Sequence, residues 1–168
     1  MKPILYLGCP VWAHAPWRGK FSTASARREE FLPQYASVFR KAEGNTAFYG
    51  LPSTATVARW AAEARDDFRF CFKFPRAISH EAQLVGAAEL ETRRFFERLA
   101  PLAERCGPCF LQLPESFGVS RLEGLRVFWR GCRESFPMRW KCGIAIFSTA
   151  RRKKRRWTRC SVKRVSSA

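Results

Sequence analysis

The sequence predicts an α/β fold with a parallel sheet. Four short apolar runs each end at or beside a Pro or Gly, and each is followed by a segment with apolar residues at helical spacing. Parallel strands need crossover helices, so this alternation favours a parallel sheet. With 168 residues and 46% hydrophobic content, the chain is one domain or part of a larger one. An open doubly wound sheet and a (β/α)8 barrel both fit this pattern.

The first two strand-helix units are predicted as follows. Residues 4–9 (ILYLGC) are short and apolar and stop at Pro10, which is typical of a buried strand. Residues 31–39 carry apolar side chains at helical spacing, with Pro33 in the first turn. Residues 42–50 (AEGNTAFYG) predict a second strand with a polar and aromatic tip. Ser53 then caps the next helix.

The last two units have clearer patterns. Residues 68–74 (FRFCFKF) alternate with period two, and Pro75 ends this strand. A long helix follows at about residues 90–105, with Phe95, Phe96, Leu99 and Leu102 inward. Residues 109–114 (CFLQLP) predict a fourth strand, and residues 119–132 a fourth helix.

The positive charge is concentrated at the end of the chain. Residues 138–168 contain 11 Lys and Arg and no Asp or Glu, whereas residues 1–137 contain 20 and 14. The net charge of +17 therefore says little about the rest of the chain.

The sequence also indicates a compartment. No apolar run reaches the ~18 residues of a membrane span, and no cleavable signal is evident, so we expect no membrane association. Seven cysteines without a framework spacing favour a reducing cytoplasm over a secreted scaffold.

Four ordered blocks carry a family resemblance: GCPVWAHAPWRGKF, YASVFRKAEGNTAFYGLPSTATVARWAAE, FRFCFKFPRAISHE and FLQLPESFG. Over residues 4–137 the chain resembles the YecE-like family, domain of unknown function 72. The resemblance implies a TIM-barrel-like (β/α) fold, which usually needs about 250 residues. We therefore expect residues 1–137 to be the N-terminal half of such a domain, incomplete, with about four of its eight strand-helix units.

The resemblance stops near Pro137, where the family continues with a fifth strand. Residues 138–149 read one base out of register give YAVEVRHRDFFD, with suitable codon choices, and the codons of Trp140-Lys141 force a glutamate in that reading. This favours a frameshift that truncates the domain, and we expect residues 138–168 to be an out-of-frame, disordered basic tail. The alternative is a genuine divergent tail, in which RRKKRRW binds nucleic acid weakly by charge.

Polar side chains at the C-terminal ends of strands are the candidate site, because barrel active sites form there. With aromatic walls they suit an unknown small polar or anionic ligand. The candidate ligand-binding residues are Trp12, Arg18, Glu43, Asn45, Tyr49, Lys73, His80 and Gln112. Glu43 beside Asn45 on an apolar strand is the strongest candidate. Lys73 can instead simply alternate outward, His80 can make a turn contact, and Trp12 can be a packing residue.

Other motifs give weaker indications of function. Cys106-Gly-Pro-Cys109 matches a redox CxxC, but a helix precedes it and a strand follows, the reverse of the thioredoxin order, so a Gly-Pro turn is the simpler interpretation. No Gly-rich loop follows a strand, and two histidines cannot supply a metal cluster, so we expect no cofactor and no metal.

These observations predict an uncharacterised YecE-like barrel protein, inactive and poorly folded as a truncated chain, whose intact relatives carry a rim pocket of unknown ligand. Whether the family is enzymatic does not follow from the sequence. The alternative is a nucleic-acid-binding or phosphoesterase-like barrel, which rests on analogy of fold.

Overall fold

A computed structural model describes residues 5–135 and 145–148 of the 168-residue chain. The predictions for residues 138–144 and 149–168, including the frameshift and most of the basic tail, therefore lie outside the described residues. Ala145–Ser148 fall within the segment for which we expected disorder, and the structure has them as a strand.

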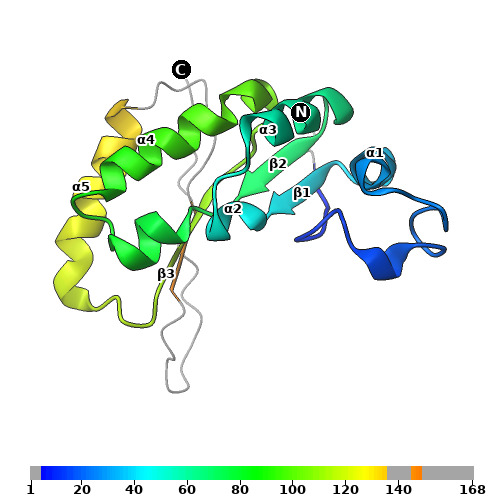
Figure 1. Cartoon of the computed structure of the whole chain (residues 1–168). Helices are drawn as coiled ribbons and strands as arrows, with labels where there is room; N and C mark the ends of the chain where they lie inside the picture. Colours follow the sequence, from blue (N-terminus) through cyan, green and yellow to red (C-terminus); the bar gives the residue numbers. More distant parts are fainter. Residues whose placement is uncertain (1–4, 136–144, 149–168) are drawn as a thin grey trace.

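The described strands are parallel and form two two-stranded sheets, β1 with β2 and β3 with β4, that lie side by side (Figure 1). Strand β1 (Lys41–Gly44) pairs with β2 (Arg69–Phe72), and β3 (Phe110–Leu113) pairs with β4 (Ala145–Ser148). Two parallel bridges, Phe70 to Cys106 and Lys73 to Phe110, join β2 to the β3 segment. The parallel sheet predicted from the strand-helix alternation is thus confirmed over the described strands.

The described residues form five α-helices: α1 (Phe31–Val38), which precedes β1, and α2 (Thr46–Tyr49), α3 (Thr54–Glu63), α4 (Ala88–Leu99) and α5 (Leu122–Ser135), which lie between the strands. Short 3-10 turns lie at Ala15–Trp17, Arg28–Glu30, Ala100–Arg105 and Val119–Arg121, and a single π-type turn at Ala77–Glu81. The Ser53 hydroxyl accepts a hydrogen bond from the Thr56 backbone N–H, which confirms the predicted cap. None of the described helices is long and apolar enough to cross a membrane.

Two predicted elements are wrong in detail. The described part of residues 4–9 is not a strand: it makes one hydrogen bond to β1, from the Glu43 N–H to the Cys9 carbonyl at 3.1 Å. Leu5 and Leu7 are 84% and 66% exposed, because nothing described covers them. In the second strand, pairing with β2 ends at Gly44, and residues 46–49 turn into α2 instead of extending the strand.

The core lies between the sheet and the helices. Phe68, Phe70, Phe72 and Phe74 are all fully buried, as the period-two pattern predicts. Trp60 of α3 stacks on Phe70 and Phe72, with ring centroids 6.1 Å apart in both pairs. Farther along, Phe74 packs against Phe95 and Phe96 of α4 and Phe128 of α5.

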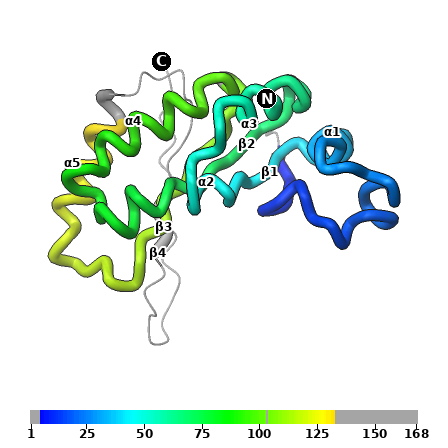
Figure 2. The backbone as a smooth tube through the Cα atoms, in the orientation of Figure 1, coloured from blue at the N-terminus to red at the C-terminus, as the bar shows by residue number. Residues whose placement is uncertain are grey.

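Tyr35 connects three parts of the chain through one buried hydroxyl. It accepts a hydrogen bond from the Cys9 N–H at 2.5 Å and donates one to the Lys41 carbonyl at 2.9 Å. Burial is the main cause that raises the pKa of Tyr35 to about 12. The N-terminal segment is therefore fixed to α1 and β1 at one end of the molecule, while α5 lies at the other end (Figure 2).

Gly44 provides a test of how closely β1 approaches β2. A methyl group at this position would lie 2.4 Å from two ring carbons of the fully buried Phe72. We expect Gly44→Ala to lower the free energy of unfolding by about 1–3 kcal/mol, the usual cost of overpacking. Urea unfolding followed by circular dichroism measures this change.

Gly50→Ala is the matched control. A side chain at Gly50 would meet nothing within 4 Å, and the backbone there is extended, so we expect a change within about 0.5 kcal/mol. Equal unfolding midpoints for the Gly44→Ala protein and the original chain would contradict the close approach.

Candidate functional site

The face of the sheet opposite the helices carries the polar side chains. Glu43 is paired in register with Cys71, and Lys73 with Phe110, so these positions point to the same side. Gln112 lies two residues after Phe110 and shares that face, while Leu111 and Leu113 are buried on the other. The alternation that fills the core with phenylalanines therefore gathers a carboxylate, an amine and an amide on the opposite side.

A pocket of about 350 Å³ opens beside the C-terminal ends of β1 and β2 and along the adjoining strand β3. The structure brings together five of the eight predicted site residues around it: Glu43, Asn45, Tyr49, Lys73 and Gln112. Phe48 and Phe110 complete the lining. The ligand-binding role of these residues stays a prediction.

Lys73 is the cationic side chain among the residues that line this pocket. Its Nζ lies 3.6 Å from the centroid of the Phe48 ring, a close cation–π contact. Burial lowers the pKa of Lys73, and the charge of Glu43 opposes this by favouring the ammonium form. Among the side chains that the structure describes, no carboxylate oxygen lies within 4.0 Å of Nζ, the limit for an ion pair.

Two further lining residues come from the segment after β1. The Asn45 amide donates a hydrogen bond to the Pro10 carbonyl at 3.3 Å, so it also holds the N-terminal segment against the end of β1. Tyr49 is 82% exposed, and its ring meets the edge of Phe48 at 5.1 Å. Tyr49 is therefore an outer wall that solvent reaches freely.

His80 lies behind the pocket and does not line it. It sits in the π-type turn Ala77–Glu81, where its Nδ1 is 2.8 Å from the hydroxyl oxygen of the fully buried Ser79. Its ring meets Phe48 edge-on at 5.1 Å, so Phe48 contacts both His80 and Lys73. Burial is the main cause that lowers the pKa of His80, with smaller effects of Lys73 and Arg76, while Glu81 raises it.

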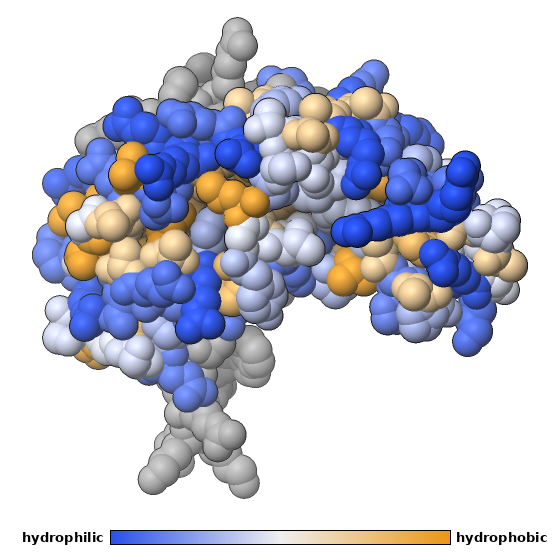
Figure 3. All heavy atoms as spheres, viewed as in Figure 1, coloured by the Kyte–Doolittle hydropathy of each residue, from blue (hydrophilic) through white to orange (hydrophobic). Residues whose placement is uncertain are grey.

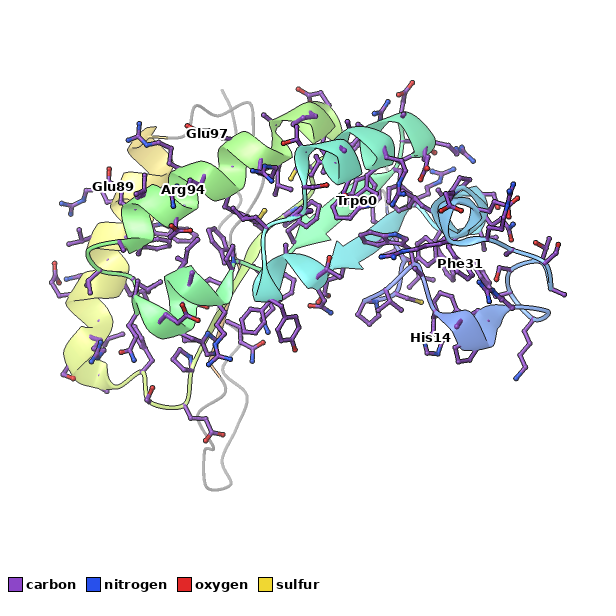
Figure 4. All side chains as sticks on the ribbon, in the orientation of Figure 1. His14, Phe31, Trp60, Glu89, Arg94 and Glu97 are labelled. Carbon is purple, nitrogen blue, oxygen red and sulfur yellow. The ribbon has the colours of Figure 1, made fainter. Side chains whose placement is uncertain are left out.

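Trp12 and Arg18 are not placed with the other candidates. Trp12 packs edge-on against Trp60 at 5.1 Å and Phe70 at 5.8 Å, on the helix side of the sheet. The large ring gains more from this buried aromatic cluster than from the solvated rim. The Arg18 guanidinium lies 5.3 Å from the Phe31 ring centroid, in the N-terminal segment where Figure 4 shows His14, far from α5.

Sequence reasoning missed two aromatic residues of the pocket. Phe110 shares the face of Gln112 because the two are separated by one residue on β3, and that spacing could have revealed it. Phe48 gave no such signal, since its position depends on α2, a single helical turn that the sequence pattern presented as strand.

The Cys106-Gly-Pro-Cys109 motif lies away from this pocket. Both cysteines are buried, and the Gly107 N–H donates to the Phe70 carbonyl at 2.7 Å, before β3 begins. Among the described residues, no group of three or more His, Cys, Asp and Glu side chains is arranged to hold a metal ion.

Comparison with known proteins gives consistent matches. Residues 6–146 match the family model described as "Protein of unknown function DUF72". The chain is 40% identical over 143 residues to the UPF0759 protein YecE of Escherichia coli K12, and of strain O157:H7, over 85% of this chain and 48% of the relatives. It thus spans about half the length of the curated relatives it matches.

Solved structures show the same relationship. A crystal structure of a DUF72 family protein from Thermotoga maritima has a TM-score of 0.66 and 22% identity, and the match covers 85% of this chain and 55% of that one. A DUF72 family protein from Enterococcus faecalis has a TM-score of 0.56 and 30% identity, over 68% and 42%. The resemblance drawn from the four sequence blocks is confirmed: the chain has a mixed α/β fold and belongs to the DUF72 family, the YecE-like proteins of unknown function.

Proposed function

We propose that this chain binds a small polar ligand with an anionic group in the pocket beside β1, β2 and β3. The observation that carries this proposal is the position of Lys73. Its ammonium lies over the Phe48 ring in a pocket of about 350 Å³, and no carboxylate of the described residues pairs with it. A partly desolvated cation without a close counter-ion favours a ligand that supplies one.

The other lining groups suggest what else the ligand carries. Glu43 accepts hydrogen bonds and repels anions, so its presence favours a ligand with a hydroxyl or amino donor at some distance from the anionic group. The Gln112 amide can both donate and accept. Phe48, Tyr49 and Phe110 offer ring surface to an apolar part of the ligand. Small phosphorylated or carboxylated polyols combine these features.

The strand arrangement supports a TIM-barrel-like setting for this site. The four described strands are parallel, neighbours in sequence are neighbours in the sheet, and the helices α3, α4 and α5 cover one face. We propose that they are consecutive strand-helix units of a (β/α) barrel, whose inner face carries Glu43, Lys73 and Gln112.

A nucleic-acid-binding barrel is the less favoured alternative. Among the residues that line the pocket only Lys73 is cationic, and Glu43 would repel a phosphate backbone. Charge elsewhere on the chain would bind nucleic acid without using this pocket, so a small ligand explains the pocket better.

Lys73→Ala tests the proposal, with glycerol 3-phosphate as the probe and uncharged glycerol as its counterpart. We expect the original chain to bind glycerol 3-phosphate and not glycerol. The alanine variant should bind it about tenfold or more weakly, since a hydrogen bond to a charged group contributes about 1.5–3 kcal/mol. Lys73→Arg should keep most of the affinity. Isothermal calorimetry measures all three.

Lys41→Ala is the matched control, because Lys41 lies on β1 but does not line the pocket. Unchanged affinity in the Lys73→Ala variant, or an equal loss in the Lys41→Ala variant, would show that glycerol 3-phosphate does not bind in this pocket.

Anion affinity should also depend on His80. The pKa of His80 is lowered from 6.5, so this side chain is neutral at pH 7 and gains its positive charge only at pH values below about 6.5. That charge forms close to Lys73 and attracts an anion. We therefore expect the affinity for glycerol 3-phosphate, corrected for phosphate ionisation, to rise as the pH falls from 7 to 5.

His80→Gln should flatten this pH profile, and His14→Gln should leave it unchanged, because His14 contacts Trp17 in the N-terminal segment. These are the two histidines of the chain. A His80→Gln profile identical to that of the original chain would show that His80 does not sense the bound anion.

A further inference from the structure

Lys73 has features that a cation used only for charge does not need. It directly follows β2, and its backbone is paired with Phe110 at the start of β3 in a parallel bridge. Its Nζ is held over the Phe48 ring and lies beside a pocket large enough for a small molecule. A rigid, accessible amine of this kind is how proteins present a nucleophile.

The surroundings of Lys73 shift its protonation equilibrium toward the neutral amine. Burial of the side chain disfavours its charged form, and the side chain has no carboxylate partner in the described sequence within ion-pair distance. The Phe48 ring and Glu43 act in the opposite sense, since both stabilise the ammonium. The balance lowers the pKa of Lys73, which places more of the nucleophilic form near neutral pH.

We propose that Lys73 is a nucleophile that forms an imine with small aldehydes or ketones bearing a carboxylate or phosphate group. This inference rests on the proposed function, because the same pocket must accept the anionic group. The substrate class is thus an acidic carbonyl compound, and the lysine would activate its carbonyl carbon and the bonds next to it.

The reaction balances with the groups that line the pocket. The Lys73 ammonium first loses a proton, and the Glu43 carboxylate on the neighbouring strand is the base available in the lining. The Nζ lone pair then attacks the carbonyl carbon as the carbon–oxygen π bond breaks, and a proton lost by the positively charged nitrogen passes to the alkoxide oxygen to give a neutral carbinolamine. Glu43 returns its proton to the departing hydroxyl, water leaves, and a carbon–nitrogen double bond remains.

Gln112 and the aromatic residues would assist this reaction in different ways. The Gln112 amide N–H can donate to the carbonyl oxygen as it becomes a hydroxyl, from the same face of the sheet as Lys73. Phe48 and Phe110 would offer ring surface to the apolar part of the substrate beside the imine.

Reductive trapping tests the proposal. The full chain is incubated at pH 7 with glyoxylate, an aldehyde bearing a carboxylate, and with acetaldehyde, its uncharged counterpart, each with cyanoborohydride. Peptide mapping then gives the adduct at every lysine. We expect glyoxylate to label Lys73 at least tenfold faster than the exposed Lys20, and acetaldehyde to show a smaller preference. Urea-unfolded chain should show no preference.

The pH profile of labelling separates a nucleophile from a merely accessible lysine. For Lys73 the midpoint should lie below that of Lys20. In Glu43→Gln the midpoint should fall further, because Glu43 raises the pKa of Lys73. The rate at high pH should fall severalfold, because no carboxylate then carries a proton from the attacking nitrogen to the departing hydroxyl. Glu89→Gln is the matched control, since Glu89 is on α4 and pairs with Arg93. It should change neither value.

Equal labelling of Lys73 and Lys20 by glyoxylate in the folded chain would overturn the imine proposal. The proposed function is judged separately by glycerol 3-phosphate, which has no carbonyl group. If Lys73→Ala loses glycerol 3-phosphate binding but Lys73 is not selectively trapped, the anion-binding proposal stands and the imine proposal is wrong. If Lys73 is selectively trapped at equal rates by glyoxylate and acetaldehyde, Lys73 is a reactive lysine but the proposed preference for anionic substrates is wrong.

Discussion

The alternation of side chains along β2 is the constraint on which both the core and the pocket depend. Phe70 and Phe72 point toward the helices, while Cys71 and Lys73 point to the opposite face. A shift of one residue in the pairing of β2 would exchange the two faces, burying an amine among aromatic rings and exposing phenylalanines. The energy of the aromatic core therefore fixes the position of Lys73, although Lys73 contributes little to that core.

One aromatic ring, Phe48, lies between two titratable side chains at the pocket. Phe48 contacts the Lys73 amine on its face and the His80 ring at its edge, so two titratable nitrogens are close without sharing a hydrogen bond. Besides burial, the charge of Lys73 is therefore one of the causes that lower the pKa of His80. The surface elsewhere is mainly hydrophilic in Figure 3, with apolar patches near α4 and α5, where Val85, Leu90 and Val127 are partly exposed.

The sequence predicts those parts of the structure that local patterns determine. The Ser53 cap, the helix that begins at Phe31 and the buried phenylalanines of β2 follow from hydrogen bonding and periodicity within a few residues. Glu43 and Lys73 could be predicted as site residues because parallel strands end at a common edge. Trp12 could not be placed, because the path of its loop is set by contacts with Trp60 and Phe70, which are distant in sequence.

The close approach at Gly44 has a consequence for how the family evolves. A side chain at position 44 fits only if the ring at position 72 is replaced by something smaller, so the two positions should vary together across homologues. Position 50 is free of this restriction, since open space surrounds it. A glycine retained at position 44 would then be a record of strand packing, even though it stands next to Glu43 and Asn45 and would look like part of a binding motif.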